Sequence, residues 1–99
     1  MEKIEVKRND NLFFIKVNDK IASSLRYNIE KDIMYIVSTF TLPAYRGRGL
    51  ASKLMQEAVN YAISSEIRKI KVHCSYARHW FKKHPEYATK FKSIDHEEI

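Results

Sequence analysis

Glycine, proline and cysteine are all scarce in this chain of 99 residues, which holds two glycines, two prolines and one cysteine. A single cysteine excludes a disulfide framework within the chain and is typical of a reducing compartment. No apolar run approaches the roughly 18 residues of a membrane-spanning helix. The N-terminal sequence MEKIEVKRND also lacks the apolar segment of a secretion signal. We therefore expect a soluble cytoplasmic domain with no membrane partner.

The charge balance is basic, with 18 Lys and Arg against 12 Asp and Glu and a net charge of +6. An anionic partner is therefore favoured, but nucleic acid, a phosphorylated small molecule and an anionic membrane all satisfy that condition. A hydrophobic content of 44% over this length is enough for one compact core and not for two. We expect a single domain over residues 1–92, followed by a loosely ordered tail over residues 93–99.

Hydrophobic periodicity predicts a run of strands before any helix. Alternation or continuous apolar character favours strands at residues 4–6, 12–17, 21–29 and 33–40. The connections between them are short and rich in Asn and Asp, so the four strands should form an antiparallel meander.

After Pro43 the apolar residues fall at helical spacing, which predicts an amphipathic helix from about residue 48 to residue 64. Residues 69–74 alternate again. A strand, helix and strand in succession imply a right-handed crossover, so this fifth strand should run parallel to the fourth. A second helix is expected over residues 75–83, ended by Pro85. The predicted fold class is α+β, with a mixed sheet and two main helices.

Both glycines stand in the segment RGRGLA, where the fourth strand gives way to the first helix. The first amide groups of a helix lack intrahelical partners, and the helix dipole makes that end attractive to phosphate. Gly47 and Gly49 carry no Cβ, so an anion can approach the backbone closely. Arg46 and Arg48 would add charged donors. The segment therefore predicts a cradle for a diphosphate.

Two well-known phosphate motifs do not fit this segment. A P-loop requires G-x-x-x-x-G-K-[ST], and Lys53 lies too close to Gly49 for that spacing. A dinucleotide-binding fingerprint requires Gly or Ala where Ser52 stands. RGRGLA does match [Q/R]-x-x-G-x-[G/A] at Arg46, Gly49 and Ala51. In this motif the chain resembles the GNAT superfamily of N-acetyltransferases, which use it to bind acyl-coenzyme A.

The resemblance extends beyond the motif. LPAYRGRGLASKL, CSYARHWFKKHPEY and the small size together resemble the minimal single-domain GNAT-like acetyltransferases, over roughly residues 5–91. This implies acetyl-CoA or CoA as cosubstrate, with the pantetheine arm along the end of the fourth strand and the thioester in a gap between the fourth and fifth strands. The implied cofactor-binding residues are Phe40, Thr41, Leu42, Arg46, Gly47, Arg48, Gly49, Leu50, Ala51 and Ser75.

Cys74 is the candidate catalytic residue. It ends the fifth strand, and the resemblance is to a group that has a cysteine here, near the acyl group. The following helix, with Ser75 as its expected N-cap, favours the thiolate, which is the competent nucleophile. The alternative is that Cys74 is a small buried hydrophobe. Members of this group often carry a histidine or an acidic residue on the strand before the proline; here Thr39 and Thr41 stand there, so no general base is identified.

The other motifs favour ordinary structural roles. His73, His79 and His84 do not form a four-ligand zinc pattern with Cys74, and we expect no metal. Aromatic residues of the second helix are expected in the core: Tyr76, Trp80 and Phe81.

Three functions follow from the sequence. The first is an acetyl-CoA-dependent N-acetyltransferase acting on an amine of a small molecule or protein, either directly or through Cys74. The second is a CoA-binding module with little or no catalysis, which the absence of a strand-borne base supports. The third, a basic nucleic-acid-binding domain, lacks an aromatic-interleaved platform or a known motif and is the least favoured. The sequence sets neither the acceptor nor the oligomeric state.

Overall fold

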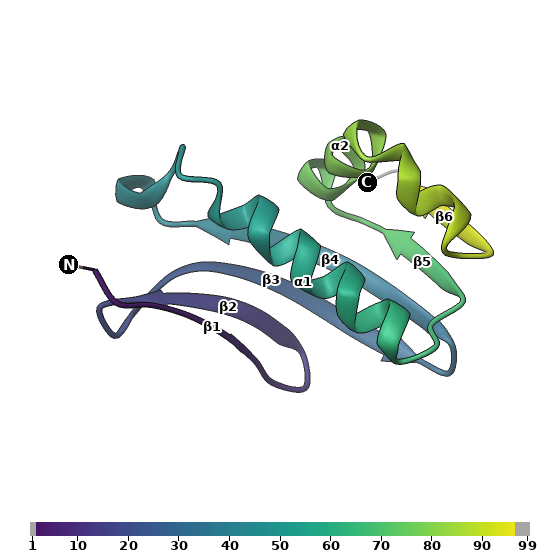
Figure 1. The fold of residues 1–99 in the computed structure, drawn as a ribbon, viewed down its shortest axis with the longest axis horizontal. Helices are drawn as coiled ribbons and strands as arrows, with labels where there is room; N and C mark the ends of the chain where they lie inside the picture. The colour runs from purple at the N-terminus through teal and green to yellow at the C-terminus, as the bar shows by residue number, and fades with distance from the viewer. Residues whose placement is uncertain (1, 97–99) are drawn as a thin grey trace.

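A computed structural model describes residues 2–96, within which six strands form one sheet in the order β1-β2-β3-β4-β5-β6 (Figure 1). The strands are β1 (Ile4–Arg8), β2 (Leu12–Val17), β3 (Lys20–Glu30), β4 (Ile33–Thr41), β5 (Lys69–Val72) and β6 (Ser93–His96). The helices are α1 (Leu50–Ser64) and α2 (Ser75–Lys83), with short 3-10 helices η1 (Pro43–Tyr45) and η2 (Pro85–Thr89). The predicted α+β class with a mixed sheet is confirmed.

The first four strands form the expected antiparallel meander. The β2–β3 turn uses Asn18 at φ 50° and Asp19 at φ 69°, and the β3–β4 turn uses Lys31 at φ 56°. Asn and Asp enter the left-handed region more easily than most residues, so the first of these turns needs no glycine. β5 then pairs with β4 in parallel, as the crossover predicted.

Both helices cover one face of the sheet (Figure 1). Successive right-handed crossovers from β4 to β5 and from β5 to β6 place their helices on the same side. α1 packs mainly over β2, β3 and β4, and α2 packs on β4, β5 and α1. The apolar stripe of α1 is fully buried against the sheet, at Leu54, Met55, Ala58, Val59 and Ala62. No helix within residues 2–96 is long and apolar enough to cross a membrane.

The start of one helix and the cap of the other differ from the prediction. α1 begins at Leu50 rather than near residue 48, because Gly49 has φ 77° and a residue in the left-handed region does not continue a right-handed helix. In α2 the N-cap is Cys74, with φ −101° and ψ 129°, and Ser75 is the first helical residue. The expectation that Ser75 caps this helix was therefore wrong by one position.

The predicted tail begins too early. Residues 93–96 form β6, which pairs in parallel with β5 and sets Ile94 beside Ile70. Ile94 packs against the hydrophobic core and ties this edge strand down. The sequence SIDH holds one apolar residue, too few to show an alternating pattern. The remainder of the predicted tail, 97–99, lies outside the described residues.

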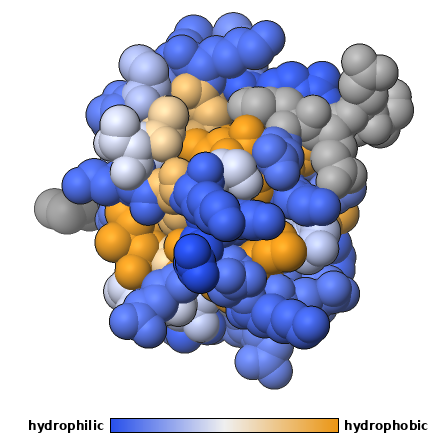
Figure 2. Space-filling view, turned by 90° about the vertical axis from the view of Figure 1, so that its right-hand side faces the viewer, coloured by the Kyte–Doolittle hydropathy of each residue, from blue (hydrophilic) through white to orange (hydrophobic). Residues whose placement is uncertain are grey.

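The end of the molecule at the right of Figure 1 is mostly hydrophilic, with hydrophobic side chains visible between the polar ones (Figure 2). A shallow hollow in the surface here has a volume of about 540 Å³. Arg68, Lys90 and Lys92 line it together with Ile63, Glu66 and Ile67. Arg68 is paired with Asp32 at 3.9 Å, so part of this charge is already neutralised within the chain.

Candidate functional site

β4 and β5 pair over only part of the length of β4. Their ladder runs from Ile33 opposite Lys69 to Ile36 opposite Val72. The His73 N–H still donates to the Ile36 carbonyl at 2.9 Å, and the chain then enters α2. β4 continues to Thr41 alongside β3 alone. The last residues of β4 therefore have an edge without a neighbouring strand.

A bulge in β4 lies where the two strands part. Arg26 on β3 faces Ser38, and the next residue, Tyr27, faces Ile36, so Val37 is an extra residue on β4. A bulge bends its strand and increases the local twist. Because it follows directly after the last residue that pairs with β5, the bulge accounts for the separation of the two strands. The gap inferred from the family resemblance is thus built into the β3–β4 register.

The backbone of Thr39 and Thr41 points into this gap. The Leu42 N–H donates to the Ala22 carbonyl of β3 at 2.8 Å, so the alternate residues direct their N–H and C=O groups away from β3. The Thr41 carbonyl accepts a hydrogen bond from Arg46 Nε at 3.2 Å. The end of β4 therefore offers an open row of backbone donors and acceptors.

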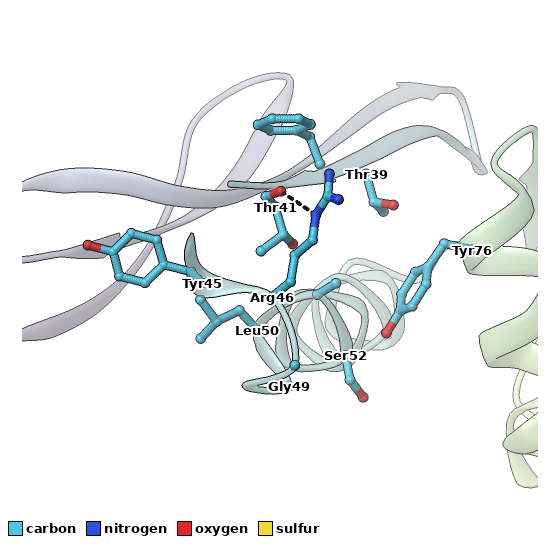
Figure 3. A pocket seen from close by; sticks show the side chains of 11 residues that line it. Thr39, Thr41, Tyr45, Arg46, Gly49, Leu50, Ser52 and Tyr76 are labelled. Carbon is cyan, nitrogen blue, oxygen red and sulfur yellow. Dashed lines mark hydrogen bonds between the residues drawn. The ribbon is translucent and has the colours of Figure 1, made fainter. Parts of the chain in front are cut away.

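A cleft of about 380 Å³ lies between this edge, α1 and α2 (Figure 3). It brings together most of the residues predicted to bind the cofactor: Phe40, Thr41, Arg46, Gly47, Gly49, Leu50 and Ala51. Its remaining lining residues were not predicted: Thr39, Tyr45, Ser52 and Tyr76. Residues from β4, the η1–α1 loop and both helices thus meet around one hollow.

Three residues predicted for the cofactor do not line the cleft. Leu42 is engaged with β3 through its N–H, and Ser75 is exposed in the first turn of α2. Arg48 turns away to form a bidentate ion pair with Glu2, and this contact lowers the pKa of that carboxyl. The Arg48 guanidinium also lies 5.5 Å from the centroid of the Tyr45 ring. Alternation of arginine and glycine in the sequence does not reveal which arginine is already paired.

The N-terminus of α1 forms one wall of the cleft. Gly47 and Gly49 have φ values of 79° and 77°, and a Cβ built on either would meet no atom within 4 Å. No side chain caps Gly49. The first helical bond is from the Lys53 N–H to the Gly49 carbonyl, at 3.0 Å. The amides of the first turn before Lys53 therefore lack helical acceptors.

Arg46 spans the cleft. Its backbone belongs to the glycine loop, and its side chain reaches the Thr41 carbonyl on the open edge of β4 (Figure 3). The side chain is exposed, and a guanidinium has more N–H donors than this one bond uses. Arg46 therefore places positive charge between the helix N-terminus and the β4 edge.

Tyr76 lies on the cleft wall instead of in the core. It is half-buried, whereas its neighbours on α2, Trp80 and Phe81, are buried as predicted. Burial raises the pKa of the Tyr76 hydroxyl above its ordinary value of 10.0; a hydrogen bond with Ser52 opposes this, and the proximity of Cys74 adds to it. Ser52 is held by the Trp80 indole N–H at 2.9 Å. Helical spacing places Tyr76 on the same face of α2 as Trp80, and Tyr76 was therefore expected in the core. The first turn of α2, which carries Tyr76, lies at the gap between β4 and β5, and this position cannot be read from the spacing.

Cys74 sits at the junction of β5 and α2. It is 9% exposed, and its Sγ lies 3.4 Å from Thr39 Oγ1 across the gap. Thr39 lines the cleft, whereas Cys74 does not. The sulfur is thus one side chain removed from the hollow.

The histidines do not converge on the cleft. His79 is exposed on α2, and His84 Nδ1 lies 2.8 Å from the Trp80 carbonyl. Among residues 2–96, no group of three or more His, Cys, Asp or Glu side chains is placed to hold a metal ion. The polar groups that line or adjoin the cleft are hydroxyl, thiol, guanidinium and backbone groups.

Comparisons with known proteins agree with this architecture. The family model for GCN5-related N-acetyl-transferases matches residues 12–90. The ribosomal-protein-S18-alanine N-acetyltransferase from Escherichia coli superposes with a TM-score of 0.66 at 13% identity, over 79% of this chain and 54% of that one. A GCN5-like protein from Staphylococcus aureus gives a TM-score of 0.65 at 23% identity, over 88% of this chain and 86% of that one.

A third solved structure has the same fold. The aminoglycoside acetyltransferase meta-AAC0020 from an uncultured soil metagenomic sample, in complex with sisomicin, gives a TM-score of 0.62 at 16% identity, over 77% of this chain and 58% of that one. The chain thus spans little more than half the length of the Escherichia coli and soil enzymes. No match was found among curated proteins. Since the family model covers most of its length, the chain belongs to the GCN5-related N-acetyltransferase family.

Proposed function

We propose that this chain binds acetyl-CoA in the cleft and transfers its acetyl group to a primary amine. The observation that carries the proposal is the uncapped N-terminus of α1, which follows Gly47 and Gly49 at positions where a Cβ would meet no atom within 4 Å. Such an end attracts phosphate through its free N–H groups and its dipole. Coenzyme A carries a diphosphate, and Arg46 beside the loop supplies a matching charge. Membership of the family supports the same ligand.

The open edge of β4 suits the pantetheine arm. Its two amide groups would pair with the backbone of Thr39 and Thr41 as an added strand does. Arg46 now donates to the Thr41 carbonyl. On binding, the guanidinium would turn to the diphosphate and free that carbonyl for the arm. The contact between Arg46 and the Thr41 carbonyl would thereby be exchanged for two contacts to the cosubstrate.

Transfer requires an amine to attack the thioester carbonyl and the CoA thiolate to leave. The carbon–nitrogen bond forms as the carbon–sulfur bond breaks, and the sulfur takes up one proton. Tyr76 is suited to give that proton, because it lines the cleft and a tyrosine, whose ordinary pKa is 10.0, is protonated at neutral pH. The attacking nitrogen loses a proton to solvent, and a solvent proton restores Tyr76.

A relay through Cys74 is a second route to the same products. The Cys74 sulfur would attack the thioester, forming an acetyl-cysteine and releasing CoA with the thiol proton. The amine would then attack the acetyl-cysteine and return the proton to Cys74. The sulfur lies within hydrogen-bonding distance of Thr39, which lines the cleft. The two routes differ in one covalent intermediate.

A CoA-binding module is the alternative function. The observation in its favour is that the cleft is lined by no carboxylate and no imidazole among the described residues, so a general base is not at hand. Such a protein would bind CoA and acetyl-CoA alike, without turnover.

The test is incubation of the protein with acetyl-CoA and a panel of primary amines. The panel should include an aminoglycoside and a peptide with N-terminal alanine, since solved relatives are named for such acceptors. Products are measured by mass and released CoA by its thiol. We expect acetylated product above the buffer rate for at least one amine, and a lower rate with Tyr76→Phe. CoA binding without any product would favour the module.

A further inference from the structure

β1 is an edge strand, paired only with β2 (Figure 1). The Lys3 carbonyl accepts from the Asn18 N–H at 2.9 Å, so the odd-numbered residues of β1 direct their backbone groups toward β2. The outward backbone groups are those of Ile4, Val6 and Arg8. This edge can therefore accept another strand.

The sequence of β1, IEVKR, is complementary to itself. When two copies pair antiparallel about Val6, Ile4 of one copy faces Arg8 of the other, and Glu5 faces Lys7. The hydrogen-bonded pairs are then Ile4 with Arg8 and Val6 with Val6, which are the residues whose backbone groups point outward. Glu5 and Lys7 fall in the pairs between them, where facing side chains come closest. Twofold symmetry produces this opposite-charge pair twice.

The side chains on the helix-covered face also fit a second copy. Beside β1 lies a groove of about 410 Å³. Its apolar part is formed by Val6, Phe13 and Tyr61, and its polar lining residues are Lys7, Arg8, Glu57, Asn60 and Ser64. Ile4 is on the same face as Val6 and is 49% exposed. In the twofold register, Ile4 of the second copy stands opposite Arg8, whose guanidinium lies 4.1 Å from the Tyr61 ring centroid at the groove. An exposed isoleucine would thus be covered next to the apolar part of the groove.

Neither α1 nor the cleft obstructs this pairing. α1 packs mainly over β2, β3 and β4, so the outer edge of β1 lies beyond the helix. The cleft lies between the end of β4 and the helices, with β2 and β3 between it and β1. Both clefts of a pair would remain open to ligand.

We propose that two copies of this chain associate through β1, with a twofold axis at Val6 that joins their sheets into one. The interface consists of main-chain pairing, the facing Glu5 and Lys7 pairs, and Ile4 seated at the groove of the other copy. It is independent of the function proposed for the cleft.

Charge variants and sedimentation equilibrium over a wide protein concentration range test the register. Wild-type protein should form a dimer. Lys7→Glu and Glu5→Lys should each raise the dimer dissociation constant by about tenfold or more, because like charges then face each other twice. The combined Glu5→Lys and Lys7→Glu variant restores opposite charges and should return to within about threefold of wild type.

Lys3→Glu is the matched control. Within one chain Glu5 contacts both Lys7, at 3.7 Å, and Lys3, at 3.8 Å. In the twofold register only Lys7 faces Glu5 of the other copy. This variant has the same change of net charge as Lys7→Glu and should dimerise within about threefold of wild type. Equal weakening by both variants, or failure of the double variant to recover, would overturn the register.

Hydrogen exchange on unaltered protein gives a test that does not depend on the variants folding. The amides of Ile4, Val6 and Arg8 should become protected as protein concentration rises, while amides of the β3–β4 turn should not change. A single chain mass at every concentration, or no added protection at these amides, would refute the association.

Discussion

Cys74 Sγ lies 3.4 Å from Thr39 Oγ1 and links the end of β5 to the part of β4 that has parted from it. The thiol is therefore held by a residue that lines the cleft, although it does not line the cleft itself. This geometry makes Cys74 testable as a relay, because its removal leaves the α1 N-terminus and the open β4 edge unchanged.

If Cys74 acts as a relay, incubation with acetyl-CoA should add one acetyl mass to the protein, removable by hydroxylamine. Cys74→Ala should abolish the adduct and slow amine acetylation while CoA affinity stays at the wild-type value. Thr39→Val is the matched control, since it removes the hydrogen bond and keeps the thiol. Acetylation by Cys74→Ala at the wild-type rate would show that the cysteine only packs.

Arg46 and Arg48 should differ in their effect on CoA binding, although each precedes a glycine. Arg46 reaches into the cleft, whereas Arg48 is paired with Glu2. Arg46→Ala should weaken CoA binding by roughly 1–3 kcal/mol, as expected for a lost charged hydrogen bond, and reduce its salt dependence. Arg48→Ala should change affinity little. Calorimetric titrations at two salt concentrations compare them, and equal losses would contradict the assignment.

Gly49 tests the diphosphate cradle. Asn tolerates the left-handed conformation that Gly49 adopts, whereas a β-branched residue there is strained by about 1–2 kcal/mol. Both Gly49→Asn and Gly49→Val should lose CoA binding, because either side chain enters the open space at the helix N-terminus. Only the Val variant should melt clearly below wild type. A stable Asn variant with wild-type CoA affinity would place the diphosphate elsewhere.

The role of Tyr76 predicts a dependence on pH. Its pKa is raised, chiefly by burial, so the hydroxyl that donates a proton persists through neutral pH and is lost only above its ordinary value of 10.0. The rate should therefore fall as pH rises through the Tyr76 pKa. The stability linked to this group should fall over the same range, since the folded state holds the proton more tightly than the unfolded chain.

Tyr76→Phe is the corresponding variant. It should lower kcat by about 10²-fold or more, which is typical of a lost general acid, with little change in the KM for acetyl-CoA. The alkaline fall in rate should also disappear. A variant that keeps both the wild-type kcat and the alkaline limb would exclude Tyr76 as the proton donor.

Much of the fold was predictable because its signals are local. Alternating apolar residues predicted the strands of the meander, and helical spacing after Pro43 predicted α1. The return to alternation after that helix predicted β5, and the strand–helix–strand order predicted that β5 is parallel to β4. β6 was missed because SIDH has too few apolar residues to alternate and is held by Ile94 packing on the core. Its place depends on contacts made across the chain, not on its own pattern.

The part of the candidate site that one continuous segment forms could be predicted from the sequence. The part formed by contacts between distant segments could not. RGRGLA led to the loop that holds Gly47 and Gly49. The partnership of Arg48 with Glu2 was hidden, because it joins residues that lie far apart in the sequence. Tyr76 was assigned to the core because its position on the cleft depends on the bulge at Val37, a property of strand register.

The most direct test of the central claim is ligand-dependent melting of the wild-type protein. A ligand at about 100 times its dissociation constant raises the free energy of unfolding of the protein that binds it by roughly 2.7 kcal/mol. Each kcal/mol raises the Tm of a domain of this size by about 4–8 °C. Acetyl-CoA and CoA should each raise the Tm by about 10 °C or more, while NAD, ATP and a short duplex DNA change it little. No shift with either CoA ligand, or a shift with DNA alone, would contradict the account.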